Sequence, residues 1–245
     1  DEAHHINAET KKGSDLNQTE LFELTSWEQT VNKIFKAHDK NLLLEFTATA
    51  DLTNPEIESK YRDKIIYDYP LKEFRKDGYS KEVKVLQADL KDFERSLQAV
   101  LLSQFRLKVF SKYNQLIKPV ILFKSRVIKE SEQHYQEFID MIKSLTAADL
   151  EKIKNNPNLD PVLQNVFKFL EENGITLANL VTELKEDFSE DKCLTVNSQS
   201  ESEEKQLAVN TLEDENNQYR AIFAVDKLNE GWDVLNLFDI VRLYN

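Results

Sequence analysis

The sequence predicts an α/β fold in which largely parallel sheets are flanked by helices. Short apolar runs such as residues 42–46 and 119–123 are bounded by polar residues, a pattern typical of buried parallel strands. Segments with apolar residues at helical spacing alternate with these runs, which favours a sheet covered by helices. A chain of 245 residues with 40% apolar content has material for one large domain or two small ones.

The first 85 residues predict a helix, two strands and a second, shorter helix. Ser26 and Gln29 have the spacing of a capping box, after which apolar residues recur at helical spacing. We expect strands at 42–46 and at 64–69, and the proline that follows would end the second strand. The next helix, residues 71–78, would stop at its terminal glycine.

The alternation of strands and helices restarts near Pro119, after a long amphipathic helix at about 90–117. We therefore divide the chain into residues 1–85, a connecting helix within 86–118, and a second domain at 119–245. Residues 145–190 are helical in pattern and acidic, and they interrupt the alternation, so we interpret them as an insertion. The elements expected around this insertion are strands at 119–123, 193–196, 220–225 and 237–241 and helices at 128–144 and 205–212.

Composition excludes several protein classes. The one cysteine, Cys193, rules out an internal disulfide and a site with several thiolate ligands, and it favours a reducing compartment. No apolar run approaches the roughly 20 residues of a membrane helix. The net charge of −12 disfavours nucleic-acid binding by the chain as a whole, so such binding would need a local basic strip. Because the chain starts at Asp1 without Met, we expect residues upstream of it.

The first four residues, Asp-Glu-Ala-His, place two carboxylates next to each other. At the carboxyl edge of a parallel sheet, such a pair can face the crevice where nucleotides bind. Asp1 would then hold Mg²⁺ through water, and Glu2 would activate the water that attacks a γ-phosphate. His4 would link this site to the next motif. The alternative is that these residues are solvated and have no role.

Two further motifs also follow predicted strands. Thr47 and Thr49 come directly after residues 42–46, and their hydroxyls could pass hydrogen bonds between a nucleotide site and a second domain; the alternative is a plain turn. The Glu-Gly-Trp-Asp run at 230–233 follows the strand 220–225. Its glycine would allow close backbone approach, and its aspartate could bind a ribose.

Lys124, Ser125 and Arg126 follow the strand 119–123 and could contact a phosphate backbone, or they could simply begin a helix with solvated charges. The remaining histidines, His5, His38 and His134, have no partner at metal-ligand spacing, so the sequence assigns them no role. No phosphate-binding loop of the form G-x-x-x-x-G-K-[ST] occurs in these 245 residues.

Together these motifs resemble superfamily 2 helicases and translocases, and within that group they look most like the Res (restriction) subunits of type III restriction-modification enzymes. Residues 224–234 and 238–243 carry most of the resemblance, and residues 1–5 and 46–50 agree with it. The segment 67–78 is similar to the end of the first RecA-like domain of such a motor. Residues 145–190 are least covered by the resemblance.

The resemblance implies a RecA-like fold, with part of the first domain in residues 1–85 and most of the second, incomplete at its carboxyl end, in 119–245. It implies an ATP-dependent DNA translocase or helicase associated with an endonuclease and located in the cytoplasm. ATP and Mg²⁺ would be its cofactors. Double-stranded DNA and the modification (methyltransferase) subunit would be its partners.

The resemblance also assigns roles to individual residues. Asp1 would bind Mg²⁺ and Glu2 would be the catalytic base, while His4 would act with them in coupling. Coupling to DNA movement would continue through Thr47 and Thr49. The nucleotide contacts would be Glu230, Gly231 and Asp233, and the DNA-backbone contacts would be Lys124, Ser125 and Arg126.

The chain departs from the family pattern in three places. The phosphate-binding loop should precede Asp1, and the arginine finger should follow Asn245. Val225 stands where many relatives have a threonine that contacts nucleic acid. Phosphate binding and neutralisation of transition-state charge depend on the first two parts, so we expect residues 1–245 alone not to hydrolyse ATP.

Two other interpretations stay open. The chain could be a non-catalytic scaffold that docks a protein through the acidic segment 145–190, which the net charge favours and the order of the motifs opposes. It could also be an RNA or repair helicase of the same superfamily, because a motor core contacts the nucleic-acid backbone and carries little sequence information.

Overall fold

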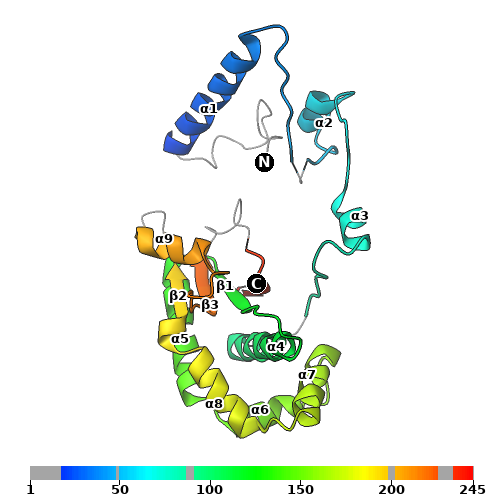
Figure 1. The fold of residues 1–245 in the computed structure, drawn as a ribbon. Helices are drawn as coiled ribbons and strands as arrows, with labels where there is room; N and C mark the ends of the chain where they lie inside the picture. Colours follow the sequence, from blue (N-terminus) through cyan, green and yellow to red (C-terminus); the bar gives the residue numbers. More distant parts are fainter. Residues whose placement is uncertain (1–17, 48–49, 87–90, 198–201, 226–233, 245) are drawn as a thin grey trace. The chain divides into compact units, whose positions relative to one another are not determined.

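The chain divides into two compact units, residues 1–85 and residues 86–245 (Figure 1). Among the residues that the structure describes, no helix is both long enough and apolar enough to cross a lipid bilayer. The computed structural model describes residues 18–47, 50–86, 91–197, 202–225 and 234–244.

The described part of the first unit contains three helices. The side chain of Asn54 caps the second of them by accepting a hydrogen bond from the backbone N–H of Glu56 at 2.9 Å. The third confirms the short helix predicted at 71–78, and Gly78 beyond its end has the positive φ of 82° expected of a glycine stop. The helices are α1 (Gln18–Lys36), α2 (Pro55–Tyr61) and α3 (Leu71–Lys76).

Both strands predicted in the first unit are wrong. Residues 42–46 and 64–69 have no regular secondary structure, and Leu42 and Ile66 are 90% and 87% exposed. A strand needs a neighbouring strand to pair its backbone N–H and C=O groups. No other strand is present among the described residues of this unit, so the apolar runs have nothing to pair with.

The capping box predicted at Ser26 is also wrong. Ser26 lies inside α1, which begins at Gln18. The sequence upstream of Ser26 already has apolar residues, Leu21 and Leu24, at helical spacing. Continuing an existing helix adds one hydrogen bond per residue without a new nucleation cost, so the local capping preference does not start a separate helix here.

The second unit is built on a four-stranded parallel sheet with strand order β2-β3-β1-β4. All four strands predicted for this part of the chain are confirmed. In the central pair, Ser125 of β1 lies opposite Val225 of β3, and on the other side Lys124 pairs with Arg242 of β4. The strands are β1 (Val120–Ser125), β2 (Cys193–Val196), β3 (Ala221–Val225) and β4 (Leu237–Arg242).

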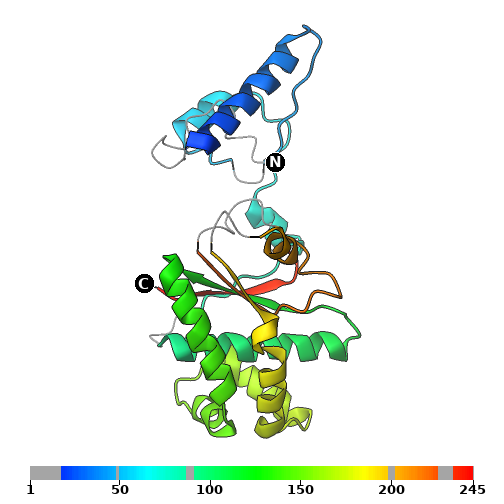
Figure 2. The same cartoon turned by 90° about the vertical axis from the view of Figure 1, so that its left-hand side faces the viewer.

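The two faces of the sheet pack against different helices, as Figure 2 shows. Phe123 of β1 points into the larger core, where its ring stacks on Phe223 of β3 with centroids 4.6 Å apart. Leu122 points to the opposite face, against the smaller core that contains Val209. The larger core contains α4 (Asp92–Lys112) and α5 (Ile128–Ser144), and the smaller one contains α9 (Glu203–Asn210).

Residues 145–190 form three helices that share the larger core. Leu150, Leu163 and Leu184 are each fully buried there, together with residues of β1 and α4. These helices therefore extend the packing of the sheet and have no separate core. They are α6 (Ala147–Lys154), α7 (Pro161–Glu172) and α8 (Leu177–Asp187), and a 3-10 turn at Glu190–Lys192 leads into β2.

Candidate nucleic-acid interface

The structure places one group of the predicted site residues together, at the carboxyl end of β1. Lys124 and Ser125 are the last residues of this strand and Arg126 follows it. Thr47 lies in an irregular stretch of the first unit. The predicted residues that lie outside the described parts of the chain are Asp1, Glu2, His4, Thr49, Glu230, Gly231 and Asp233.

Alternation along β1 puts Lys124 and Ser125 on opposite faces of the sheet, and Arg126 follows the end of the strand. Ser125 follows the same face as Phe123, toward α4 and α5, and is only 1% exposed. Its hydroxyl oxygen lies 2.8 Å from Nδ1 of His134 on α5. Lys124 is half-buried, while Arg126 is exposed. Ser125 therefore anchors the turn, and Arg126 presents its charge at the edge of the sheet.

Arg126 also contacts the segment that leaves β4. Its guanidinium carbon lies 5.3 Å from the centre of the Tyr244 ring, within the range of a cation–π contact. Because β1 and β4 pair in parallel, their carboxyl ends meet at the same edge. Val225 ends β3 at this edge as well, and residues 226–233 follow it in the sequence. Ligands of open α/β sheets bind outside this edge.

The sequence pattern assigns His134 no role, but the structure places its ring beside Ser125 at the carboxyl end of β1. Its Nε2 lies 4.0 Å from Oδ2 of Asp92 in the first turn of α4. Asp92 pairs with Arg95 at 3.2 Å, and Arg95 donates to the backbone carbonyl of Arg242 at 3.0 Å. The available signal was the position of His134, one turn before the buried Phe138 on the apolar face of a predicted helix.

A second polar network lies where β3 begins, at the opposite edge of the sheet. Arg220 is 3% exposed, and its Nε donates to the carbonyl of Pro119 at 2.9 Å. Its guanidinium also pairs with Asp187 at 3.4 Å and lies over the ring of Phe188. Burial lowers the pKa of Arg220, and the neighbouring Asp187 opposes this change. The network fixes β3 to α4 and α8.

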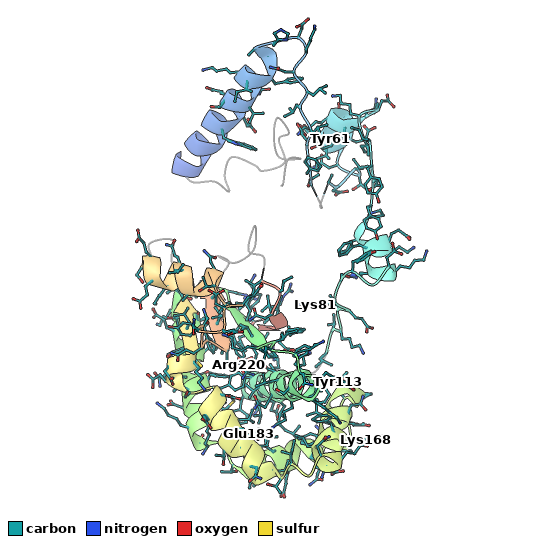
Figure 3. All side chains as sticks on the ribbon, in the orientation of Figure 1. Tyr61, Lys81, Tyr113, Lys168, Glu183 and Arg220 are labelled. Carbon is teal, nitrogen blue, oxygen red and sulfur yellow. The ribbon has the colours of Figure 1, made fainter. Side chains whose placement is uncertain are left out.

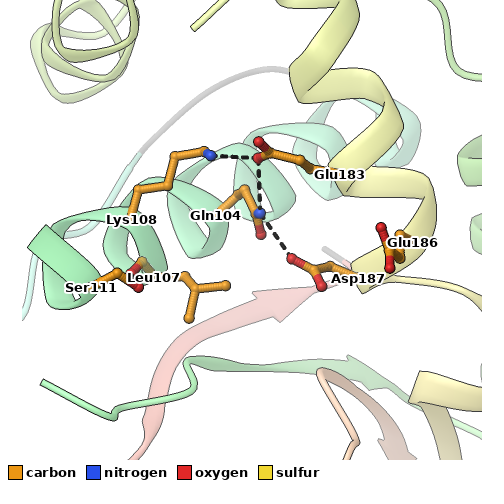
Figure 4. Close-up of a pocket in the computed structure, with 7 residues that line it drawn as sticks. All are labelled: Gln104, Leu107, Lys108, Ser111, Glu183, Glu186 and Asp187. Atoms are coloured by element: carbon orange, nitrogen blue, oxygen red, sulfur yellow. Dashed lines mark hydrogen bonds and ion pairs between the residues drawn. The ribbon is translucent and has the colours of Figure 1, made fainter. Parts of the chain in front are cut away.

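A polar cavity of about 400 Å³ adjoins this network between α4 and α8 (Figure 4). Gln104 donates to Asp187 at 2.9 Å, and Lys108 pairs with Glu183 at 2.5 Å across the cavity (dashed lines in Figure 4). Figure 3 places Glu183 and Arg220 in the same unit. Lys108, the cationic side chain of the cavity lining, is already paired with Glu183, so the cavity presents no unpaired cation to a ligand.

The described residues do not form a metal site. No group of three or more histidine, cysteine, aspartate or glutamate side chains among them could hold a metal ion. The carboxylates predicted to act on Mg²⁺, Asp1 and Glu2, lie outside the described residues.

No protein-family model matches the chain, and no solved structure matches it. The probable type III restriction-modification enzyme HindVIP Res subunit of Haemophilus influenzae is 36% identical to it over 278 aligned residues. The match includes 100% of the chain and 54% of the relative, so the chain spans about half the length of that protein. This confirms the resemblance predicted from the motifs: along its whole length, the chain is a homologue of a type III restriction-modification Res subunit.

Proposed function

We propose that the chain is part of an ATP-dependent motor that moves on double-stranded DNA within a type III restriction endonuclease. The observation that carries this proposal is the 36% identity to a probable Res subunit over the whole chain. The parallel sheet supports it, because the DNA-contact and nucleotide-contact motifs follow two neighbouring strands, β1 and β3, at their carboxyl ends.

In this proposal Asp1 holds Mg²⁺ and Glu2 is the catalytic base for ATP hydrolysis, which His4, Thr47 and Thr49 couple to movement. Glu230, Gly231 and Asp233 contact the nucleotide. Lys124 and Arg126 contact the DNA backbone, and Ser125 holds the turn between them. Bound ATP with Mg²⁺ supplies the phosphoryl group whose transfer to water drives movement.

The proposed partners are double-stranded DNA and the modification (methyltransferase) subunit, and the proposed compartment is the cytoplasm. The name of the relative, a subunit of a restriction-modification enzyme, supports both partners. The chain would bind DNA locally despite its net charge of −12, because Lys124 and Arg126 lie at one edge of the sheet.

The test uses the parent protein and measures ATP hydrolysis with and without duplex DNA. We expect DNA to stimulate hydrolysis and Glu2→Gln to abolish it, because the amide cannot accept the proton of the attacking water. Glu82→Gln is the matched control, since Glu82 is an exposed carboxylate of the first unit. Equal activity in wild type and Glu2→Gln would rule out the assigned base. The isolated 245-residue chain should show no hydrolysis.

One observation favours a second function, protein docking by residues 145–190. The helices α7 and α8 carry exposed acidic residues such as Glu172 and Glu186, which would attract a basic partner surface. A parent protein that binds its modification subunit but shows no DNA-stimulated hydrolysis would favour this scaffold function over the motor. An RNA or repair helicase would instead show hydrolysis without any associated restriction activity.

A further inference from the structure

His134 connects three elements at the carboxyl edge of the sheet. One ring nitrogen, Nδ1, lies 2.8 Å from the hydroxyl of Ser125 at the end of β1. The other, Nε2, faces Asp92 in the first turn of α4 at 4.0 Å. Because the two nitrogens lie on different sides of one rigid ring, the side chain spans the distance between β1 and α4 from its position on α5.

Arg95 continues this connection to β4. It pairs with Asp92 at 3.2 Å and donates to the carbonyl of Arg242 at 3.0 Å. Tyr244, two residues after Arg242, lies under the guanidinium of Arg126, which follows β1. These contacts therefore link β1, α5, α4 and β4 in a closed ring around the carboxyl ends of β1 and β4, and each contact restricts the side chains next to it.

We infer that His134 is a positioning residue for the DNA contact: through Ser125 it holds Lys124 and Arg126 in the orientation that meets the phosphate backbone. This inference rests on the proposed function. A loop that is already ordered before binding avoids the entropy cost of ordering on DNA. Without the bond from His134, Ser125 would be a buried hydroxyl without its partner, and the turn after β1 would rearrange to solvate it.

Three substitutions of His134 separate positioning from bulk packing. His134→Ala removes both contacts. His134→Asn puts an amide near the place of Nδ1 and can keep the bond to Ser125, whereas His134→Gln reaches toward Asp92 and leaves Ser125 without a partner. His38→Ala is the control, because His38 is an exposed histidine of the first unit.

The measurement is the affinity of the full 245-residue chain for a fluorescein-labelled 25-base-pair DNA duplex at several salt concentrations. We expect His134→Ala and His134→Gln to weaken binding on the order of tenfold and to lower the salt slope by about one, as for loss of a phosphate contact. His134→Asn and His38→Ala should bind as wild type does. Thermal unfolding of each variant identifies any that is not folded.

The inference is wrong if folded His134→Ala binds DNA with wild-type affinity and salt slope, or if His134→Asn is as weak as His134→Ala. Should His134→Ala not fold, the comparison of His134→Asn with His134→Gln decides, and equal binding by these two contradicts the inference. A Lys124→Ala/Arg126→Ala variant that binds like wild type would instead overturn the DNA contact itself, and the role of His134 with it.

Discussion

Short apolar runs of the same kind adopt different structures in the two units of the chain. In the second unit the apolar run at 119–123 becomes a buried strand, and Phe123 is fully buried between helices and sheet. In the first unit the equally apolar run at 42–46 stays irregular, and Leu42 and Phe46 are exposed. Both runs have the length and composition of a strand.

An apolar run therefore becomes a strand only where a partner strand and a covering layer are available. β1 has β3 on one side and β4 on the other, and helices cover both faces of the sheet. The described residues of the first unit contain no strand that could pair with 42–46. The second unit should therefore account for most of the cooperative stability of the chain.

The largest expected effect is a core truncation in the second unit. Phe123→Ala removes a ring stacked on Phe223 and should lower the free energy of unfolding by about 3–5 kcal/mol. Phe46→Ala, at a 71% exposed ring of the first unit, should change it by less than about 0.5 kcal/mol. Urea unfolding followed by circular dichroism measures both, and similar losses would contradict the comparison.

A smaller effect is expected from the buried arginine. Arg220→Met removes the buried guanidinium that donates to the carbonyl of Pro119 and pairs with Asp187, and it should cost about 1–3 kcal/mol because buried acceptors lose their donor. Arg62→Met breaks an exposed pair with Glu58 in the first unit and should leave the unfolding midpoint unchanged. An equal shift for the two variants would show that the burial of Arg220 is not what matters.

Cys193 reports on the second unit alone, because it is the one cysteine of the chain. Burial in β2 raises the pKa of its thiol from the usual 9.0 to about 12. Between pH 9 and 12 the unfolded state loses this proton and the folded state keeps it, so the contribution of Cys193 to stability falls as pH rises. Wild type should lose more stability over this range than Cys193→Ala, and parallel pH profiles would argue against burial.

The same pKa shift predicts slow labelling of the native protein. Because the thiolate is the reactive form, Ellman's reagent should react with Cys193 slowly at pH 8 in native protein and rapidly in urea. Fast labelling without urea would mean that β2 opens readily and that the second unit is not the stable one.

The smallest effects should come from matched helix caps. Asp160→Ala in the second unit removes the side chain that accepts from the N–H of Val162 at 2.8 Å, and it should cost about 1 kcal/mol. Asn54→Ala removes the corresponding cap of α2 in the first unit, where the bond is 2.9 Å. That change should not move the main unfolding transition. A loss of equal size in that transition would mean that the two units unfold together.

The strands and most helices of the second unit could be predicted because each apolar run there has its partners within the same unit. The prediction of a strand at 42–46 was wrong because the sequence of an apolar run does not show whether a neighbouring strand exists. The predicted DNA-contact segment at 124–126 lies together at one edge because its residues are consecutive in the chain. Thr47 lies in an irregular stretch of the first unit, and the other predicted site residues lie outside the described parts of the chain. The roles of all of them stay predictions.

Polar residues that lie between packed elements were the main features that the sequence did not predict. His134 and Arg220 each obtain their roles from residues distant in sequence, such as Asp92 for the first and Ser103 for the second. Hydrophobic periodicity marks which face of an element is buried, but it does not say which polar groups meet there. Which polar groups come into contact depends on how the strands and helices pack against each other.

The most direct test of the motor is ATP-dependent displacement of a triplex-forming oligonucleotide from duplex DNA by the parent protein. The proposed translocase should release the oligonucleotide with ATP, but not with a non-hydrolysable ATP analogue, and Glu2→Gln should release none. Failure of the wild-type protein to displace the oligonucleotide, under conditions where it binds the duplex, would contradict the proposed translocase.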